Sequence, residues 1–110
     1  MSAKTLIVFF NLKNDTDETA YLNWAKEADL PTVNRLNSVT SFNVYKGLNM
    51  FGTQNTSPWD YFEVIEVGSE EAFLEDVQTG EMQAIVEQFN SFAKDAQFIV
   101  TENILGAMNS

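Results

Sequence analysis

The 110-residue sequence contains no cysteine and no histidine. Without cysteine the chain has no disulfide, thiol nucleophile or zinc–thiolate site. Without histidine it lacks the usual general base near neutral pH and the ligand that most zinc, iron and copper sites require. We therefore expect neither a metal nor another cofactor, and any chemistry would have to use carboxylates, tyrosines and amides.

Basic residues are also scarce, with six Lys and Arg against sixteen Asp and Glu, for a net charge of −10. A surface this acidic opposes binding to nucleic acid or anionic lipid, because phosphate repulsion would have to be overcome. No apolar run approaches the roughly 20 residues that span a bilayer. The start, MSAKTLIVFF, is too brief for a signal peptide. We expect a cytoplasmic protein with no nucleic-acid or membrane partner.

Against these absences, 45% of the residues are hydrophobic, enough for a real core in one domain. Residues 4–12, KTLIVFFNL, form a short apolar run rich in β-branched and aromatic residues, which predicts a central strand. Residues 39–46 alternate as a second strand. Residues 57–67, SPWDYFEVIEV, alternate as a third strand, which puts Trp59, Tyr61, Glu63, Ile65 and Val67 on one face, and residues 97–105 form the last.

Helical patterns lie between these strands. Asp15 and Glu18 have the spacing of a capping box, and an apolar stripe follows until Leu30-Pro31 ends or kinks the helix. That stripe comprises Ala20, Tyr21, Trp24, Ala25 and Ala28.

A second helical region begins after the third strand. Ser69 is the expected cap of its first helix, and Thr79-Gly80 is expected to break it. The next helix carries a core stripe of Met82, Ile85, Val86, Phe89 and Phe92.

The order β-α-β-β-α-β predicts an α+β, ferredoxin-like fold formed by one domain over residues 1–110. Its four-stranded antiparallel sheet should have the first and third strands at the centre and both helices on one face. The other face would then expose either Leu6, Val8 and Phe10 or Ile7 and Phe9. A bare apolar patch of this size is unusual in a monomer, so we expect a second copy to cover it in a homodimeric α/β barrel.

Three segments resemble a known family: YLNWAKEADLPTVNRLNSVTSFNVY, WDYFEVIEV and FIVTENI. Together they are similar to the RedY-like, or HapK-type, proteins named from prodiginine pigment biosynthesis, and the resemblance runs over roughly residues 4–105. The family more often has tyrosine where this chain has Trp59. The resemblance implies a homodimer with a pocket for a small, flat organic molecule, such as an aromatic or pyrrole-type intermediate.

Glu63 is the sharpest candidate for a functional residue. It lies in the middle of a strand between Tyr61 and Ile65, where an unpaired carboxylate is costly to bury. Desolvation would favour its neutral form, which can donate a hydrogen bond or take part in proton transfer. The alternative is a Glu paired with a basic side chain or a tyrosine hydroxyl at a subunit boundary.

Other polar candidates have weaker support. Glu102 is either a second acid facing the same pocket or an edge-strand charge that discourages aggregation. Asn11 ends the first strand and could orient a substrate carbonyl or simply bind the strand end. Asp29 is interpreted as a turn or cap residue rather than a base.

An aromatic set with polar tips would suit a planar ligand through stacking and a few hydrogen bonds. The loop at residues 47–58, with Met50 and Phe51, would be either a lid over the cavity or a flap on the partner subunit. The candidate ligand-binding residues are Trp24, Tyr45, Phe51, Trp59 and Tyr61.

The leading functional hypothesis is a homodimeric, cofactor-independent pocket protein. It would act on or bind an aromatic or pyrrole-type intermediate in a condensation or tailoring step. One alternative is a cofactor-independent monooxygenase of an aromatic intermediate, and another is a non-catalytic binder or carrier.

Overall fold

The computed structural model describes residues 3–106. Four strands form one antiparallel sheet in the order β2-β3-β1-β4, so β1 and β3 are central, as predicted. The α+β, ferredoxin-like prediction is confirmed. The strands are β1 (Lys4–Leu12), β2 (Val39–Lys46), β3 (Tyr61–Val67) and β4 (Ala93–Thr101).

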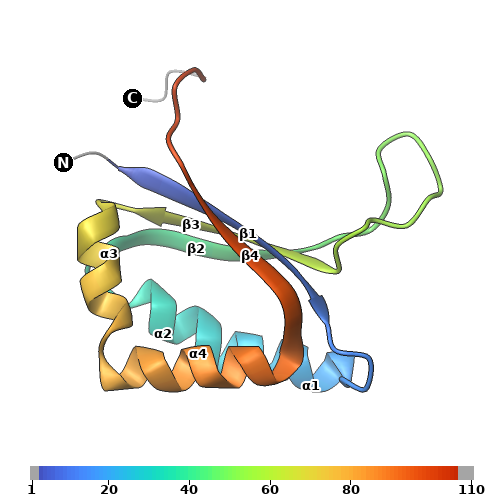
Figure 1. Ribbon diagram of the computed structural model, residues 1–110, viewed down its shortest axis with the longest axis horizontal. Coiled ribbons are helices and arrows are strands. Elements are labelled where there is room, and N and C mark those ends of the chain that lie inside the picture. Colours follow the sequence, from blue (N-terminus) through green and yellow to red (C-terminus); the bar gives the residue numbers. More distant parts are fainter. Residues whose placement is uncertain (1–2, 107–110) are drawn as a thin grey trace.

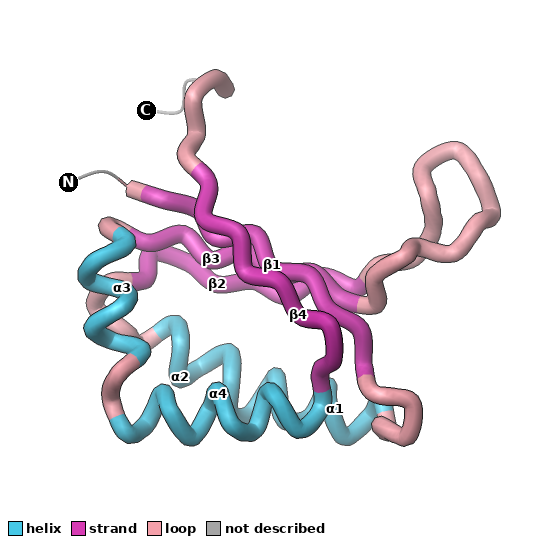
Figure 2. Tube along the Cα trace, viewed as in Figure 1, coloured by secondary structure: helices cyan, strands magenta, loops and turns pink. Residues whose placement is uncertain are grey.

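All helices of the described chain lie on one face of the sheet (Figures 1 and 2). The first is a continuous helical segment whose middle is a π-helical turn. The second helical region follows β3, and its last helix runs directly into β4. The elements are α1 (Glu18–Trp24), the π turn η1 (Ala25–Asp29), α2 (Leu30–Asn34), α3 (Glu70–Val77) and α4 (Gly80–Phe92).

The core lies between the sheet and the helices. On β3 every second side chain is buried, which confirms the predicted alternation from Tyr61 onward. On β1 the buried set is Leu6, Val8 and Phe10, so this strand points Ile7 and Phe9 to the other side. The buried side chains of β3 are Tyr61, Glu63, Ile65 and Val67.

We call the uncovered side of the sheet the open face. It is defined by the alternate residues Ile7, Phe9, Tyr45, Phe62, Val64 and Ile99, which lie side by side through the strand register. Its side chains are only partly covered, and Tyr45 and Ile99 are 54% and 45% exposed. No described helix lies over this face (Figure 1).

Residues 47–60, which we call the arm, connect β2 to β3 and extend well beyond the body of the molecule (Figure 1). The arm has structure of its own, since Asn49 pairs with Thr56 and the N–H of Met50 donates to the carbonyl of Asn55 at 2.8 Å. A Cβ on Gly47 would lie 2.2 Å from the carbonyl oxygen of Trp59, so only glycine lets the two legs cross this closely. Phe51, at the far end, is fully exposed.

Three predicted boundaries need correction. The first helix is capped by Asp17, whose carboxylate accepts from the N–H of Thr19 at 3.0 Å, and not by Asp15. β3 begins at Tyr61, because the preceding residues belong to the arm. β4 covers residues 93–101 and not 97–105, because α4 passes into the strand at Ala93 without a turn.

Candidate functional site

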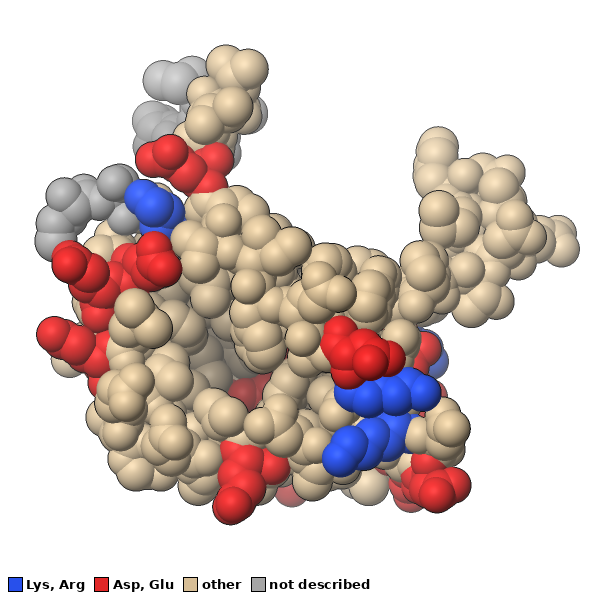
Figure 3. All heavy atoms as spheres, in the orientation of Figure 1, with Lys and Arg blue, Asp and Glu red and all other residues tan. Residues whose placement is uncertain are grey.

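A cavity of about 430 Å³ lies between the sheet and the helices. Figure 3 shows the molecule hollowed between β4 and the helices of the second region, with acidic atoms visible inside the hollow. Its walls are mostly aliphatic and aromatic, and within the described chain no Lys or Arg lines it. The lining residues used below are Asp29, Glu63, Glu70, Phe73, Phe89 and Phe98.

Glu63 projects from the central strand β3 into this cavity and is only 4% exposed. Its Oε2 has no hydrogen-bond partner among the described residues. Burial, with a further contribution from the charge of Asp29, raises the pKa of Glu63 from 4.5 to about 8. The carboxyl group is therefore largely neutral near pH 7 and can either donate or accept a proton.

Asp29 reaches the same cavity because of the π turn η1. The N–H of Leu30 donates to the carbonyl of Ala25, five residues back, and Pro31 cannot supply the N–H that a regular α-helix would need there. The wider turn brings Tyr21, Ala25, Asp29 and Val33 to the buried side at a constant spacing of four residues.

Asp29 is 4% exposed, and burial raises its pKa from 3.8 to about 7. The cavity thus contains two buried carboxyl groups that face no basic side chain among the described lining residues, and the charge of Asp29 adds to the effect of burial on the pKa of Glu63. We call Asp29 and Glu63 the acid pair.

The hydroxyl of Tyr21 is near enough to the acid pair for the charges of Glu63 and Asp29 to act on it, although Tyr21 is not among the residues that line the cavity. Tyr21 is fully buried, and its hydroxyl has no hydrogen-bond partner within the described residues. Burial is the main cause that raises its pKa, and the charges of Glu63 and Asp29 add to it. Tyr21 therefore stays protonated and offers a hydroxyl donor behind the cavity.

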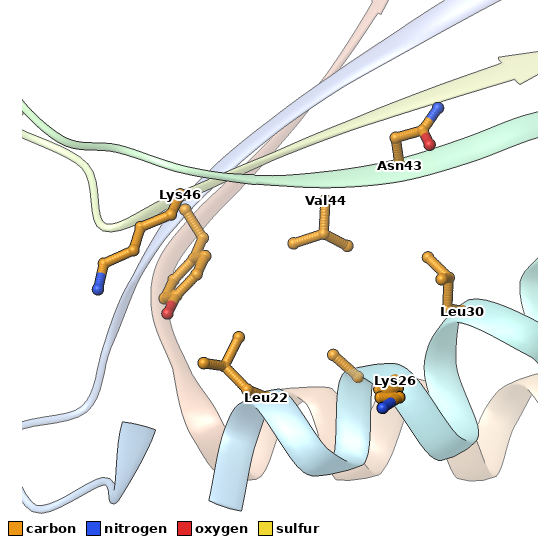
Figure 4. A pocket seen from close by; sticks show the side chains of 8 residues that line it. Leu22, Lys26, Leu30, Asn43, Val44 and Lys46 are labelled. Carbon is orange, nitrogen blue, oxygen red and sulfur yellow. The ribbon is translucent and has the colours of Figure 1, made fainter. Parts of the chain in front are cut away.

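A second cavity, of about 340 Å³, lies between the first helical segment and β2 (Figure 4). Tyr61 lines it and donates a short hydrogen bond to Glu18, which also pairs with Lys46 at 3.0 Å. The hydrogen bond from Tyr61, followed by Lys46, lowers the pKa of Glu18. This carboxylate is thus satisfied by protein groups, unlike Oε2 of Glu63.

Of the three predicted catalytic residues, only Glu63 lines the larger cavity. The side chain of Glu102 is 58% exposed and lies 3.7 Å from Lys4, beyond the end of β4. Asn11 accepts a hydrogen bond from the N–H of Asp60 at 2.9 Å, which holds the end of β1 to the arm. Neither Asn11 nor Glu102 is among the residues that line the larger or the smaller cavity.

The predicted ligand-binding aromatics are scattered. Trp24 packs against Phe92 and donates to Gln88 at 2.6 Å, so it joins α1 to α4. Trp59 does not share the face of Tyr61 as predicted, because it precedes the strand and contacts Phe9, with 4.8 Å between ring centroids. Tyr45 lies on the open face, Phe51 lies at the end of the arm, and Tyr61 lines the smaller cavity.

Sequence reasoning assigned no role in the site to Tyr21 and interpreted Asp29 as a turn or cap residue. Tyr21 belonged to a predicted core stripe, and nothing in the sequence distinguished its hydroxyl from any other. For Asp29 a signal existed, since Asp29 falls four residues after the stripe residue Ala25 and shortly before a proline. A helix that continues past that proline needs a wide turn, and a wide turn directs Asp29 inward.

The described residues set two further limits. Among them, no group of three or more Asp or Glu side chains is arranged to hold a metal ion. None of the helices within residues 3–106 has the length and apolar character needed to cross a membrane.

The strand order, the single layer of helices and the internal cavity define a ferredoxin-like α+β protein with an interior pocket. The chain belongs to the family described as REDY-like protein HapK, whose family model matches residues 4–104. This confirms the resemblance seen in the sequence. A search of curated proteins found no match to the chain.

Solved structures share the fold at low sequence identity. HapK from Hahella chejuensis is 23% identical, with a TM-score of 0.77 over 97% of this chain and 98% of that one. The hydroxynitrile lyase from Passiflora edulis is 10% identical, with a TM-score of 0.78 over 96% and 98%. A protein from Bacteroides fragilis, described as dimeric, of unknown function and with a ferredoxin-like fold, is 18% identical, with a TM-score of 0.68 over 94% and 98%.

Proposed function

We propose that this chain is a homodimeric small-molecule protein that holds an aromatic or pyrrole-type intermediate in the larger cavity and assists a condensation or tailoring step on it. The observation that carries the proposal is the apolar cavity of about 430 Å³ that contains the unpartnered carboxyl of Glu63. A volume in this range accommodates a small organic molecule. Membership of the REDY-like HapK family supports the choice of a pyrrole-type intermediate, since the family is named from prodiginine pigment biosynthesis.

The chemistry that the site supports is proton transfer. Glu63 is the proposed catalytic residue, because its raised pKa lets it exchange a proton near neutral pH. The phenol of Tyr21 has no hydrogen-bond partner within the described residues. It would donate a hydrogen bond to negative charge that develops nearby during proton transfer. Asn11 and Glu102 do not enter the proposed mechanism, since neither lines the cavity.

The proposed dimer rests on the open face. Its central residues Phe9, Phe62 and Val64 are apolar and have no covering element among the described helices. The ferredoxin-like protein from Bacteroides fragilis is described as dimeric, which supports a second copy as the cover. The arm extends away from the cavity of its own chain. This position favours a flap that covers a partner subunit over a lid that closes the cavity.

The test is to incubate the purified protein with bipyrrole and monopyrrole aldehydes and amines, in air and without oxygen, and to follow binding and products by mass spectrometry. We expect saturable binding and a product that forms equally in both atmospheres. Glu63→Gln should lower the turnover rate at least about 100-fold while the dimer persists. A strict oxygen requirement would instead identify a monooxygenase, and binding without turnover would identify a carrier.

A further inference from the structure

The acid pair is an unusual feature in the lining of an apolar cavity. Two carboxyl groups, each 4% exposed, share a space whose walls are mostly hydrocarbon. Buried carboxylates are normally paired with a cation or saturated by hydrogen bonds. Within the described chain no Lys or Arg lines the cavity, and Oε2 of Glu63 accepts no hydrogen bond.

Another carboxylate of the chain, that of Glu18, has both a hydrogen-bond donor and a cation as partners. Glu18 receives a hydrogen bond from Tyr61 and an ion pair from Lys46, two residues that line the smaller cavity. The described lining of the larger cavity offers Glu63 nothing comparable, although a basic residue at an apolar lining position would be a simple substitution. The described lining therefore supplies no positive group to the acid pair, and a bound ligand can supply one.

From this geometry we infer that the larger cavity selects ring compounds that carry a cationic nitrogen, which binds directly to Asp29 and Glu63. The inference rests on the proposed function, since it specifies what the same cavity accepts. The rings would contact Phe73, Phe89 and Phe98 on the cavity walls. The nitrogen would donate to the open lone pairs of Glu63.

The ionisable groups around this position are all acidic or phenolic within the described chain. They are Asp29, Glu63 and Glu70 on the lining, with Tyr21 behind them. A cation that enters this site favours the ionised form of the acid pair. A proton held by the pair then leaves to the solvent, so that one positive charge replaces another.

The experiment compares three probes of matched size by isothermal titration calorimetry at pH 7. They are 1-naphthylmethylamine, which is a cation, 1-naphthalenemethanol, which is neutral, and 1-acetylnaphthalene, which offers only a hydrogen-bond acceptor. We expect the amine to bind at least about 10-fold more tightly than either neutral probe. Repetition in two buffers of different ionisation enthalpy should show release of up to one proton per amine bound.

Glu63→Gln removes the charge and keeps the shape, and it should abolish both the preference for the amine and the proton release. Glu102→Gln makes the same chemical change at an exposed carboxylate outside the cavity, and it should alter neither. Asp29→Asn provides a second variant of the acid pair, should Glu63→Gln fail to fold.

The possible results distinguish cation selection from pocket function. If the three probes bind with equal affinity, the inference of cation selection is overturned while the proposed pocket function stands. Cation selection is also overturned if the ketone binds best, because Glu63 would then act as a hydrogen-bond donor to a carbonyl. If none of the probes binds at millimolar concentration, both the pocket function and the inference are overturned.

Discussion

The helix-covered face and the open face of the sheet are built from alternate residues of the same strands, yet they differ in what they enclose. The covered face encloses a cavity with two buried acids, Asp29 and Glu63. The central residues of the open face on β1 and β3 are apolar, with Phe9 and Phe62 neighbours at 6.4 Å between ring centroids, and Asn43 and Gln97 lie beside them on the outer strands. Charge thus lies where a small molecule can compensate it, and apolar surface lies where a second copy can cover it.

Phe9→Asp on the open face should give the largest effect. In a symmetric dimer each carboxylate would meet the same apolar surface, or its own copy, across the interface. Like charges in an interface cost several kcal/mol, so we expect the dimer dissociation constant to rise at least about 100-fold. Sedimentation velocity at micromolar concentration measures the change.

A matched control is Leu22→Asp, which adds the same charge to an exposed leucine on the helix side. It should leave the association state unchanged. If Phe9→Asp sediments as the wild-type dimer, or if the wild-type protein is already a folded monomer at this concentration, the open face has no role in assembly.

Glu63→Gln on the covered face should change how stability depends on pH. Because the pKa of Glu63 rises from 4.5 to about 8 on folding, the folded protein keeps a proton that the unfolded chain loses within this range. This contribution to stability is full below pH 4.5 and is lost as the pH rises towards 8. The wild-type free energy of unfolding should therefore fall by about 2–4 kcal/mol more than that of the variant between pH 5 and 8.

Urea denaturation at the two pH values checks this difference. Glu102→Gln, which removes an exposed carboxylate, should follow the wild-type pH dependence. Parallel curves for wild type and Glu63→Gln would mean that Glu63 is solvated or paired in the folded protein.

Glu18→Gln should have the smallest effect, and its pH dependence should have the opposite sign. The pKa of Glu18 is lowered by Tyr61 and Lys46, so its contribution is present above pH 4.5 and is lost as the pH falls through the lowered value. Since Glu18 is well exposed to solvent, we expect the melting temperature at pH 7 to fall by no more than a few degrees. Differential scanning fluorimetry from pH 3 to 7 would show whether the difference narrows at acid pH, and a widening there would contradict the assignment.

The strands that alternate clearly were predictable from the sequence. Residues 4–12 and 39–46 have the same bounds in the structure, because each run is bordered by polar or glycine-containing turns. The last strand was placed four residues late, since α4 passes into β4 at Ala93 with no proline or glycine to mark the change. Helix-to-strand junctions of this kind leave no local signal in a single sequence.

The site was predictable only in part. Glu63 stood out because a carboxylate at a strand centre breaks the apolar pattern, and the structure places it in the larger cavity. Asp29 was not assigned to the site, because Leu30-Pro31 was expected to end or kink the helix and Asp29 was interpreted as a turn or cap residue, whereas the helix continues through η1 to Asn34. Trp59 was placed on the wrong face because alternation was extended into the arm, where the chain no longer has strand geometry.

The π turn at residues 25–29 amounts to one residue in excess of a regular helix. A regular α-helix over the same residues would rotate the following segment by about 100° relative to the preceding one. Asp29 would then leave the cavity, although both acids remained in the sequence. Among proteins of this fold, a change between a π turn and a regular turn at this position would therefore suffice to switch the electrostatic character of the pocket, with no substitution at either acid.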